Sequence, residues 1–127
     1  MPCTIEVLEW HVDVLTGSFF EGYLRTMMEL HICKNTTGEL VRKFAVGDVS
    51  ELLIGRDSDC DIRIRSSSIS REHCIIEQDE HGSMLLRDSD STGGTFVEGQ
   101  KIDSVRIEDG LEVVIGPAVL KFYEAEI

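Results

Sequence analysis

The sequence has few of the residues that mark disulfide-rich, membrane-spanning or multidomain proteins. Its 127 residues include four cysteines, two prolines and one tryptophan. Four cysteines are too sparse for a disulfide scaffold, and charged residues interrupt every apolar stretch before the roughly 18 residues that a membrane-spanning helix needs. No basic and apolar leader opens the chain, and no Pro/Gly/Ser-rich linker divides it. We therefore expect one soluble folding unit in a reducing, cytoplasmic compartment.

Positive charge is also scarce. The chain has 12 Lys and Arg against 24 Asp and Glu, for a formal net charge of -12. A protein with this balance lacks the general electrostatic attraction that holds proteins on nucleic acids or on anionic membranes. Neither nucleic acid nor membrane is therefore an expected partner. A net charge does not exclude a small local pocket of opposite sign, because charges across water are screened over short distances.

From residue 24 onward, short apolar segments alternate with turns rich in Gly, Asp, Ser and Thr, a pattern typical of strands. The pair Glu98-Gly99, between Phe96-Val97 and residues 100–102, predicts a tight hairpin. The spacing of these segments predicts an all-β fold, a sandwich of two antiparallel sheets. The expected strands are 28–33, 40–46, 51–54, 61–64, 73–78, 83–88, 95–97, 105–107, 112–115 and 119–123.

Residues 1–23 form an N-terminal extension whose structure the pattern leaves open. Apolar residues from Ile5 to Phe19 recur at helical spacing, whereas those from Leu8 to Val14 alternate as in a strand. The only tryptophan, Trp10, favours packing against the chain's own domain. The other reading is an interaction arm through which the protein self-associates.

Glycine and polar residues recur in a fixed order between residues 53 and 102. Gly55-Arg56 ends an apolar segment, Ser70-Arg71-Glu72-His73 follows, and Ser91-Thr92-Gly93-Gly94-Thr95 precedes the predicted hairpin. Each short motif alone is weak evidence, but the ordered series is specific. In this series the chain resembles the forkhead-associated (FHA) domain family, from about residue 26 to the C-terminus.

The resemblance implies a fold and a function. The fold is an FHA/SMAD-like β-sandwich of about eleven strands, here assigned to residues 24–127. The function is a non-enzymatic module whose loops bind a phosphothreonine in a partner protein, or in a segment of a parent protein, after phosphorylation by a Ser/Thr kinase. Binding requires no cofactor.

The motif residues suit the capture of a phosphate dianion, which carries about -1.5 to -2 charges and three acceptor oxygens at neutral pH. A receptor for it needs a guanidinium fork, hydroxyls and N–H groups on loops held by a rigid sheet. The resemblance implies that Arg56 pairs with the phosphate, Ser70 donates its hydroxyl and Arg71 adds a donor. Thr92 then contributes from the opposite loop.

Four further positions are expected to shape this site. The resemblance implies structural roles for Gly55, beside Arg56, and for His73, whose ring holds the loop that bears Ser70. By the same resemblance, Gly93 and Gly94 are expected to be peptide-backbone or loop positions of the site. The family usually has Asn where this chain has Gly93, so we expect weaker peptide binding. This departure favours the alternative function, a degenerate FHA-like domain with a structural or oligomerising role.

Metal and enzyme chemistry find little support. His31-x-Cys33 and His73-Cys74 offer nitrogen and sulfur ligands, but no Cys-x-x-Cys pair accompanies them, so a zinc site is not expected. Cys60 and Cys74 are expected to be small apolar core residues. Ser70 lies outside any Gly-x-Ser-x-Gly motif, and its spacing from His73 does not match a hydrolase triad. An enzymatic function is not expected.

Overall fold

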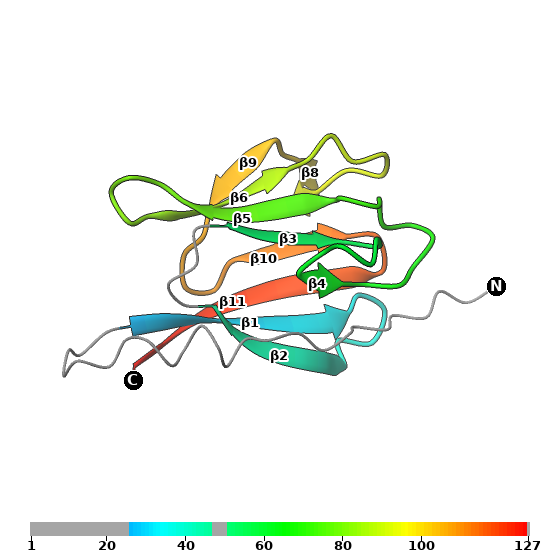
Figure 1. Cartoon of the computed structure of the whole chain (residues 1–127). Helices are drawn as coiled ribbons and strands as arrows, with labels where there is room; N and C mark the ends of the chain where they lie inside the picture. Colours follow the sequence, from blue (N-terminus) through cyan, green and yellow to red (C-terminus); the bar gives the residue numbers. More distant parts are fainter. Residues whose placement is uncertain (1–25, 47–50, 127) are drawn as a thin grey trace.

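The computed structural model describes residues 26–46 and 51–126, which form an all-β sandwich (Figure 1). Every segment that the sequence analysis expected to be a strand contains one here, and residues 100–101 of the predicted hairpin form a further short strand. The bounds are β1 Thr26–Lys34, β2 Leu40–Val46, β3 Glu51–Gly55, β4 Ile62–Arg63, β5 Cys74–Gln78, β6 Met84–Asp88, β7 Phe96–Val97, β8 Gln100–Lys101, β9 Ser104–Arg106, β10 Glu112–Ile115 and β11 Ala118–Glu126.

These strands form two sheets, which confirms the predicted sandwich. One sheet has the order β2-β1-β11-β10-β7-β8, and the other has the order β4-β3-β5-β6-β9. Neighbouring strands are antiparallel except β3 and β4, which run parallel, so the second sheet is mixed. Residues 56–61 connect the two parallel strands. Directly after β4, the N–H of Ile64 donates to the carbonyl oxygen of Gly55 at 2.8 Å.

The core lies between the two sheets. In strands such as β3 and β10, alternate residues are buried, as the period of a β-strand requires. Burying a large apolar side chain in this way stabilises the fold by about 1.5–3 kcal/mol. The fully buried core side chains include Leu30, Ile32, Ile54, Ile62, Ile64, Ile69, Ile76, Leu86, Ile115, Leu120 and Phe122.

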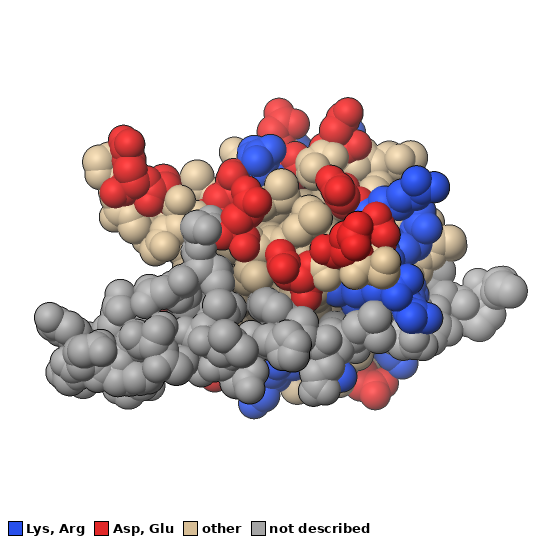
Figure 2. Space-filling model, viewed as in Figure 1, with Lys and Arg blue, Asp and Glu red and all other residues tan. Residues whose placement is uncertain are grey.

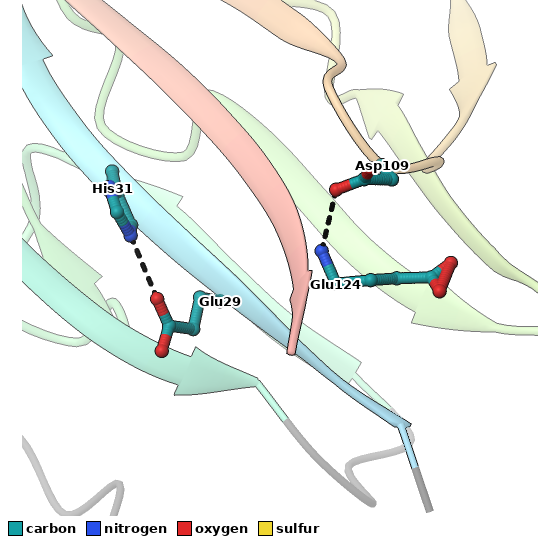
Figure 3. A network of polar contacts seen from close by, with 4 residues as sticks. All are labelled: Glu29, His31, Asp109 and Glu124. Carbon is teal, nitrogen blue, oxygen red and sulfur yellow. Dashed lines mark hydrogen bonds and ion pairs between the residues drawn. The ribbon is translucent and has the colours of Figure 1, made fainter. Parts of the chain in front are cut away.

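The last strand is longer than predicted. Strand β11 continues to Glu126 because it pairs with β1 along its whole length, from Ala118 opposite Lys34 to Glu126 opposite Thr26. The connection before β10 secures its far end: the carboxylate of Asp109 accepts the backbone N–H of Glu124 at 2.8 Å (Figure 3). Long pairing thus joins the first and last of the described strands, which are far apart in sequence.

On the outer face of β1, a histidine and a glutamate interact along the strand. Nε2 of His31 lies 3.0 Å from a carboxylate oxygen of Glu29 (Figure 3). The ring of His31 also contacts Tyr123 of β11, with 4.7 Å between ring centroids. His31 therefore has protein partners on its own sheet. The two-residue spacing of His31 and Cys33 is the ordinary period of a β-strand.

The hairpin predicted at Glu98-Gly99 joins β7 and β8. Val97 pairs with Gln100 across it. Both turn residues have positive φ, 51° at Glu98 and 78° at Gly99, as a two-residue hairpin turn of the type I′ class requires. The prediction of this turn is confirmed.

The expectations for residues 1–23 lie outside the described residues and remain predictions. Within the described residues, no three or more His, Cys, Asp or Glu side chains are grouped so that they could hold a metal ion. The same part of the chain contains no helix long and apolar enough to cross a membrane.

Candidate functional site

Three connections meet at one end of the sandwich and enclose an open pocket. They are the β3–β4, β4–β5 and β6–β7 connections, at the right-hand end of the view in Figure 1. The pocket has a volume of about 530 Å³. All four side chains predicted to bind phosphate are in it. Its lining consists of Arg56, Asp57, Ser70, Arg71, Glu72, Asp90 and Thr92.

Hydrogen bonds hold Arg56 at the end of β3. Its backbone N–H donates to the carbonyl oxygen of Ser70 at 2.9 Å, and its Nε donates to the carbonyl oxygen of Ile69 at 3.0 Å. Because Nε is engaged, the terminal nitrogens of the guanidinium are the groups that can contact an anion. The guanidinium is therefore oriented before any ligand binds.

Arg63 supports Arg56 from the neighbouring strand. Its Nε donates to the carbonyl oxygen of Arg56 at 2.8 Å. Sequence reasoning missed this role, because it depends on the parallel pairing that places Arg63 beside Gly55. No local signal in the sequence indicates that pairing.

Ser70 and Thr92 are joined directly across two connections. The backbone N–H of Thr92 donates to the hydroxyl oxygen of Ser70 at 2.9 Å. The Ser70 oxygen is thus an acceptor in this contact, and its own proton can be donated into the pocket. One hydrogen bond therefore aligns the two hydroxyl-bearing residues that the sequence analysis selected.

Gly55 is needed for a close backbone approach. A Cβ at this position would lie 2.2 Å from the carbonyl oxygen of Arg71, a distance that no packed side chain can occupy. That oxygen also accepts the N–H of Asp57 at 3.1 Å and the thiol of Cys60 at 3.1 Å. The tight contact fixes the backbone at Arg71 against the end of β3.

His73 is fully buried and links two of the connections. Its Nδ1 accepts the backbone N–H of Ser70 at 3.1 Å, so Nε2 carries the proton and donates to the carbonyl oxygen of Gly94 at 3.0 Å. Burial lowers the pKa of His73, against the opposing effects of Gly94 and Asp88, which keeps the ring neutral. The ring bonds the backbone of Ser70, whereas a catalytic base would bond its hydroxyl.

A carboxylate organises the connection that carries Thr92. Asp88 accepts hydrogen bonds from the hydroxyls of Ser91 and Thr95, each at 2.6 Å, and from the N–H of Ser91 at 3.0 Å. Burial alone would raise the pKa of Asp88, but these hydrogen bonds outweigh it and hold the pKa below its ordinary value. Sequence reasoning missed this network, although Asp and Ser side chains commonly bond nearby backbone groups in turns.

The two adjacent glycines differ in their surroundings. Gly93 is exposed, and a Cβ there would meet only the carbonyl oxygen of Ser68, at 3.5 Å. Gly94 is buried with φ of +90°, and its carbonyl oxygen is the one that His73 holds. Neither glycine lines the pocket.

The two cysteines near the site behave differently from each other. Cys74 is fully buried in β5, as predicted. The expectation that Cys60 is a core residue is wrong: it lies in the β3–β4 connection, is half-buried, and donates its thiol to Arg71. Burial raises the pKa of Cys60 to about 11, so the thiol stays protonated and unreactive at neutral pH.

Comparison with known proteins agrees with this geometry. The family model described as FHA domain matches residues 52–116. The chain is 40% identical over 68 residues to proliferation marker protein Ki-67 of Homo sapiens, which covers 53% of this chain and 2% of that protein. The chain thus spans a small part of that relative's length.

Two solved structures share the fold. The FHA domain of the CT664 protein from Chlamydia trachomatis has a TM-score of 0.67 and 25% identity, covering 78% of this chain and 98% of that one. A structure from work on phosphothreonine-dependent FHA domain interactions has a TM-score of 0.64 and 25% identity, covering 76% of this chain and 95% of that one. Together with the family-model match over more than half of the chain, these likenesses show that the chain belongs to the FHA domain family.

Proposed function

We propose that the chain is a phosphothreonine-dependent interaction module, which binds a protein segment after a Ser/Thr kinase has phosphorylated it. The convergence of Arg56, Ser70, Arg71 and Thr92 on one open pocket carries this proposal. A phosphate dianion offers three acceptor oxygens, and guanidinium and hydroxyl donors on rigid loops match them. The solved FHA structure from work on phosphothreonine-dependent interactions supports the same reading.

Each residue then has a distinct part in binding. The terminal nitrogens of Arg56 pair with two phosphate oxygens, because its Nε is already bonded to Ile69. Ser70 donates its hydroxyl proton to the phosphate while its oxygen holds the N–H of Thr92. Arg71 supplies a second guanidinium or a backbone donor, and the hydroxyl of Thr92 closes the pocket from the other side.

The chain's negative charge does not prevent anion binding at this site. A direct charge pair at 4 Å is worth up to about 4 kcal/mol at an effective dielectric near 20. Carboxylates more than about 8 Å away across water are largely screened at physiological ionic strength. The attraction of a phosphate to the two arginines therefore outweighs its repulsion by the distant carboxylates that contribute to the formal charge of -12.

A second candidate is a structural or oligomerising domain without phosphopeptide binding. Gly93 favours it, because a glycine cannot make the side-chain hydrogen bond to a ligand's backbone that asparagine makes. The loss of one such bond weakens binding by about two- to tenfold, which is too little to abolish recognition of the phosphate. The phosphothreonine module is therefore the better supported function.

Binding measurements distinguish the two candidates. Peptides from one library, each with phosphothreonine, phosphoserine or unmodified threonine, are titrated against the chain by fluorescence anisotropy. We expect selective binding of phosphothreonine peptides and its loss, by more than about tenfold, in Arg56→Ala. Arg87→Ala is the matched control, since Arg87 lies outside the pocket and pairs with Glu77. Equal binding of modified and unmodified peptides would favour the structural role.

A further inference from the structure

We infer that this pocket selects phosphothreonine segments whose neighbouring residues are basic. The inference rests on the proposed function and adds the chemical class of the partner. Its basis is a set of three carboxylates in the pocket lining, which we call the acidic rim: Asp57, Glu72 and Asp90.

The acidic rim comes from all three connections that form the pocket. Asp57 follows Arg56 in the β3–β4 connection, Glu72 follows Arg71 in the β4–β5 connection, and Asp90 lies in the β6–β7 connection. Each carboxylate therefore lies within two residues of a proposed phosphate-binding residue. Because all three also line the pocket, a peptide anchored there by its phosphate lies near these carboxylates.

The three rim carboxylates have no ion-pair partner in the part of the chain that the structure describes. Glu72 and Asp90 are exposed, and Asp57 is half-buried. The pocket lining has two arginines against three carboxylates, so its formal charge is negative before any ligand binds.

The pocket therefore favours a negative charge on the phosphate and positive charges on the residues that flank the phosphothreonine. The phosphate accepts hydrogen bonds directly from guanidinium and hydroxyl groups. Such hydrogen bonds to a charged group are short and strong. Flanking side chains lie farther out, where the acidic rim attracts cations and repels anions. Each exposed charge pair changes affinity by about 1.4- to fivefold, and several pairs in one ligand reinforce one another.

The distribution of charge over the molecule supports a local origin for this selectivity. Figure 2 shows Lys and Arg side chains gathered at the end of the sandwich that holds β4, while Asp and Glu side chains form several patches on the adjacent visible face. A ligand anchored among the cations extends onto an acidic surface. The partner is therefore a threonine-containing segment rich in Lys or Arg, which is the product of a kinase that itself prefers basic sequences.

The test uses three phosphothreonine peptides of equal length with Lys, Ser or Glu at the flanking positions, titrated by fluorescence anisotropy at low and high salt. We expect affinity to fall in the order Lys, Ser, Glu, with about tenfold or more between the extremes at low salt and a smaller range at high salt. Asp57→Asn, Glu72→Gln and Asp90→Asn remove the rim charges without changing side-chain size. Asn is well suited to position 90, where φ is 56°.

Glu80→Gln is the matched control for net charge. It removes one negative charge from an exposed side chain in the β5–β6 turn, at the opposite end of the sandwich in Figure 1. We expect the triple rim variant to reduce the preference for Lys flanks severalfold and Glu80→Gln to leave it unchanged. The inference fails if the three peptides bind within twofold of one another, or if the control reduces the preference as much as a single rim variant. No binding of any phosphothreonine peptide would instead overturn the proposed function.

Discussion

Nε2 of His73 lies 3.0 Å from the carbonyl oxygen of Gly94, so one buried imidazole holds two connections of the pocket together. The other ring nitrogen accepts the N–H of Ser70. Both nitrogens are thus engaged in a way that only the neutral ring permits, because the protonated ring has no acceptor. The shape of the pocket therefore depends on the charge state of this residue.

Stability should decrease in mild acid because of His73. Its pKa is lowered by burial from the ordinary value of 6.5, so the unfolded chain binds the proton more readily. This contribution to the free energy of unfolding is fully present above pH 6.5 and is lost as the pH falls toward the folded-state pKa. Urea unfolding between about pH 8 and pH 5 measures it.

The control for this prediction is His81→Gln, which changes an exposed histidine in the β5–β6 turn and should leave the pH dependence intact. His73→Gln should flatten the dependence in this window. Asp88 also makes stability fall in acid, but at lower pH. Its pKa is lowered in the folded state, so its contribution to stability is lost only below pH 3.8, the ordinary pKa of an aspartate. An identical pH dependence in His73→Gln would contradict the assignment.

Gly55→Ala should destabilise the fold by about 3 kcal/mol, at the upper end of the cost of overpacking, because the new methyl group would meet the backbone of Arg71. Backbone cannot move aside as a flexible side chain can. Gly93→Ala is the control, since its methyl group has ordinary contact distance to Ser68. Thermal and urea unfolding compare the two variants, and equal stability would show that the β3 end relaxes freely.

Gly93→Asn should strengthen binding of phosphothreonine peptides by about two- to tenfold, through one added hydrogen bond to the ligand's backbone. The position accepts a Cβ, whose nearest neighbour would be 3.5 Å away. Gly93→Ala lacks the amide and should not reproduce the gain. Isothermal titration calorimetry of both variants with one peptide decides this, and a gain in the alanine variant would point instead to a stiffer loop.

Arg63→Met should weaken phosphopeptide binding by about two- to tenfold although Arg63 does not line the pocket. The variant loses the hydrogen bond to the carbonyl oxygen of Arg56 and with it the support of that backbone. Arg106→Met removes a comparable hydrogen bond, to Ser83, and should leave the dissociation constant unchanged. Wild-type affinity in Arg63→Met would show that Arg56 needs no such support.

The strands could be predicted from short-range patterns in the sequence, whereas the four phosphate-binding candidates were implied by the resemblance of the ordered motifs to the FHA domain family. Alternation of apolar residues marks a strand with one face in the core, and residues 40–46 and 112–115 match their predicted bounds. The strand bounds depend on neighbours along the chain. That the loops of Arg56 and Ser70 meet at one end of the sandwich was implied by the family resemblance and not by a local pattern.

Tertiary structure alone decided the features that depend on which strands become neighbours. The parallel pairing of β3 with β4 places Arg63 where its Nε reaches the carbonyl oxygen of Arg56, and Cys60, in the connection between these strands, is half-buried instead of lying in the core. The presence of Asp90 in the same pocket lining as Asp57 and Glu72 likewise requires three separate connections to fold together. Hydrophobic periodicity specifies which face of a strand is buried, but the pairing of distant strands results from packing over the whole core, which no local pattern encodes.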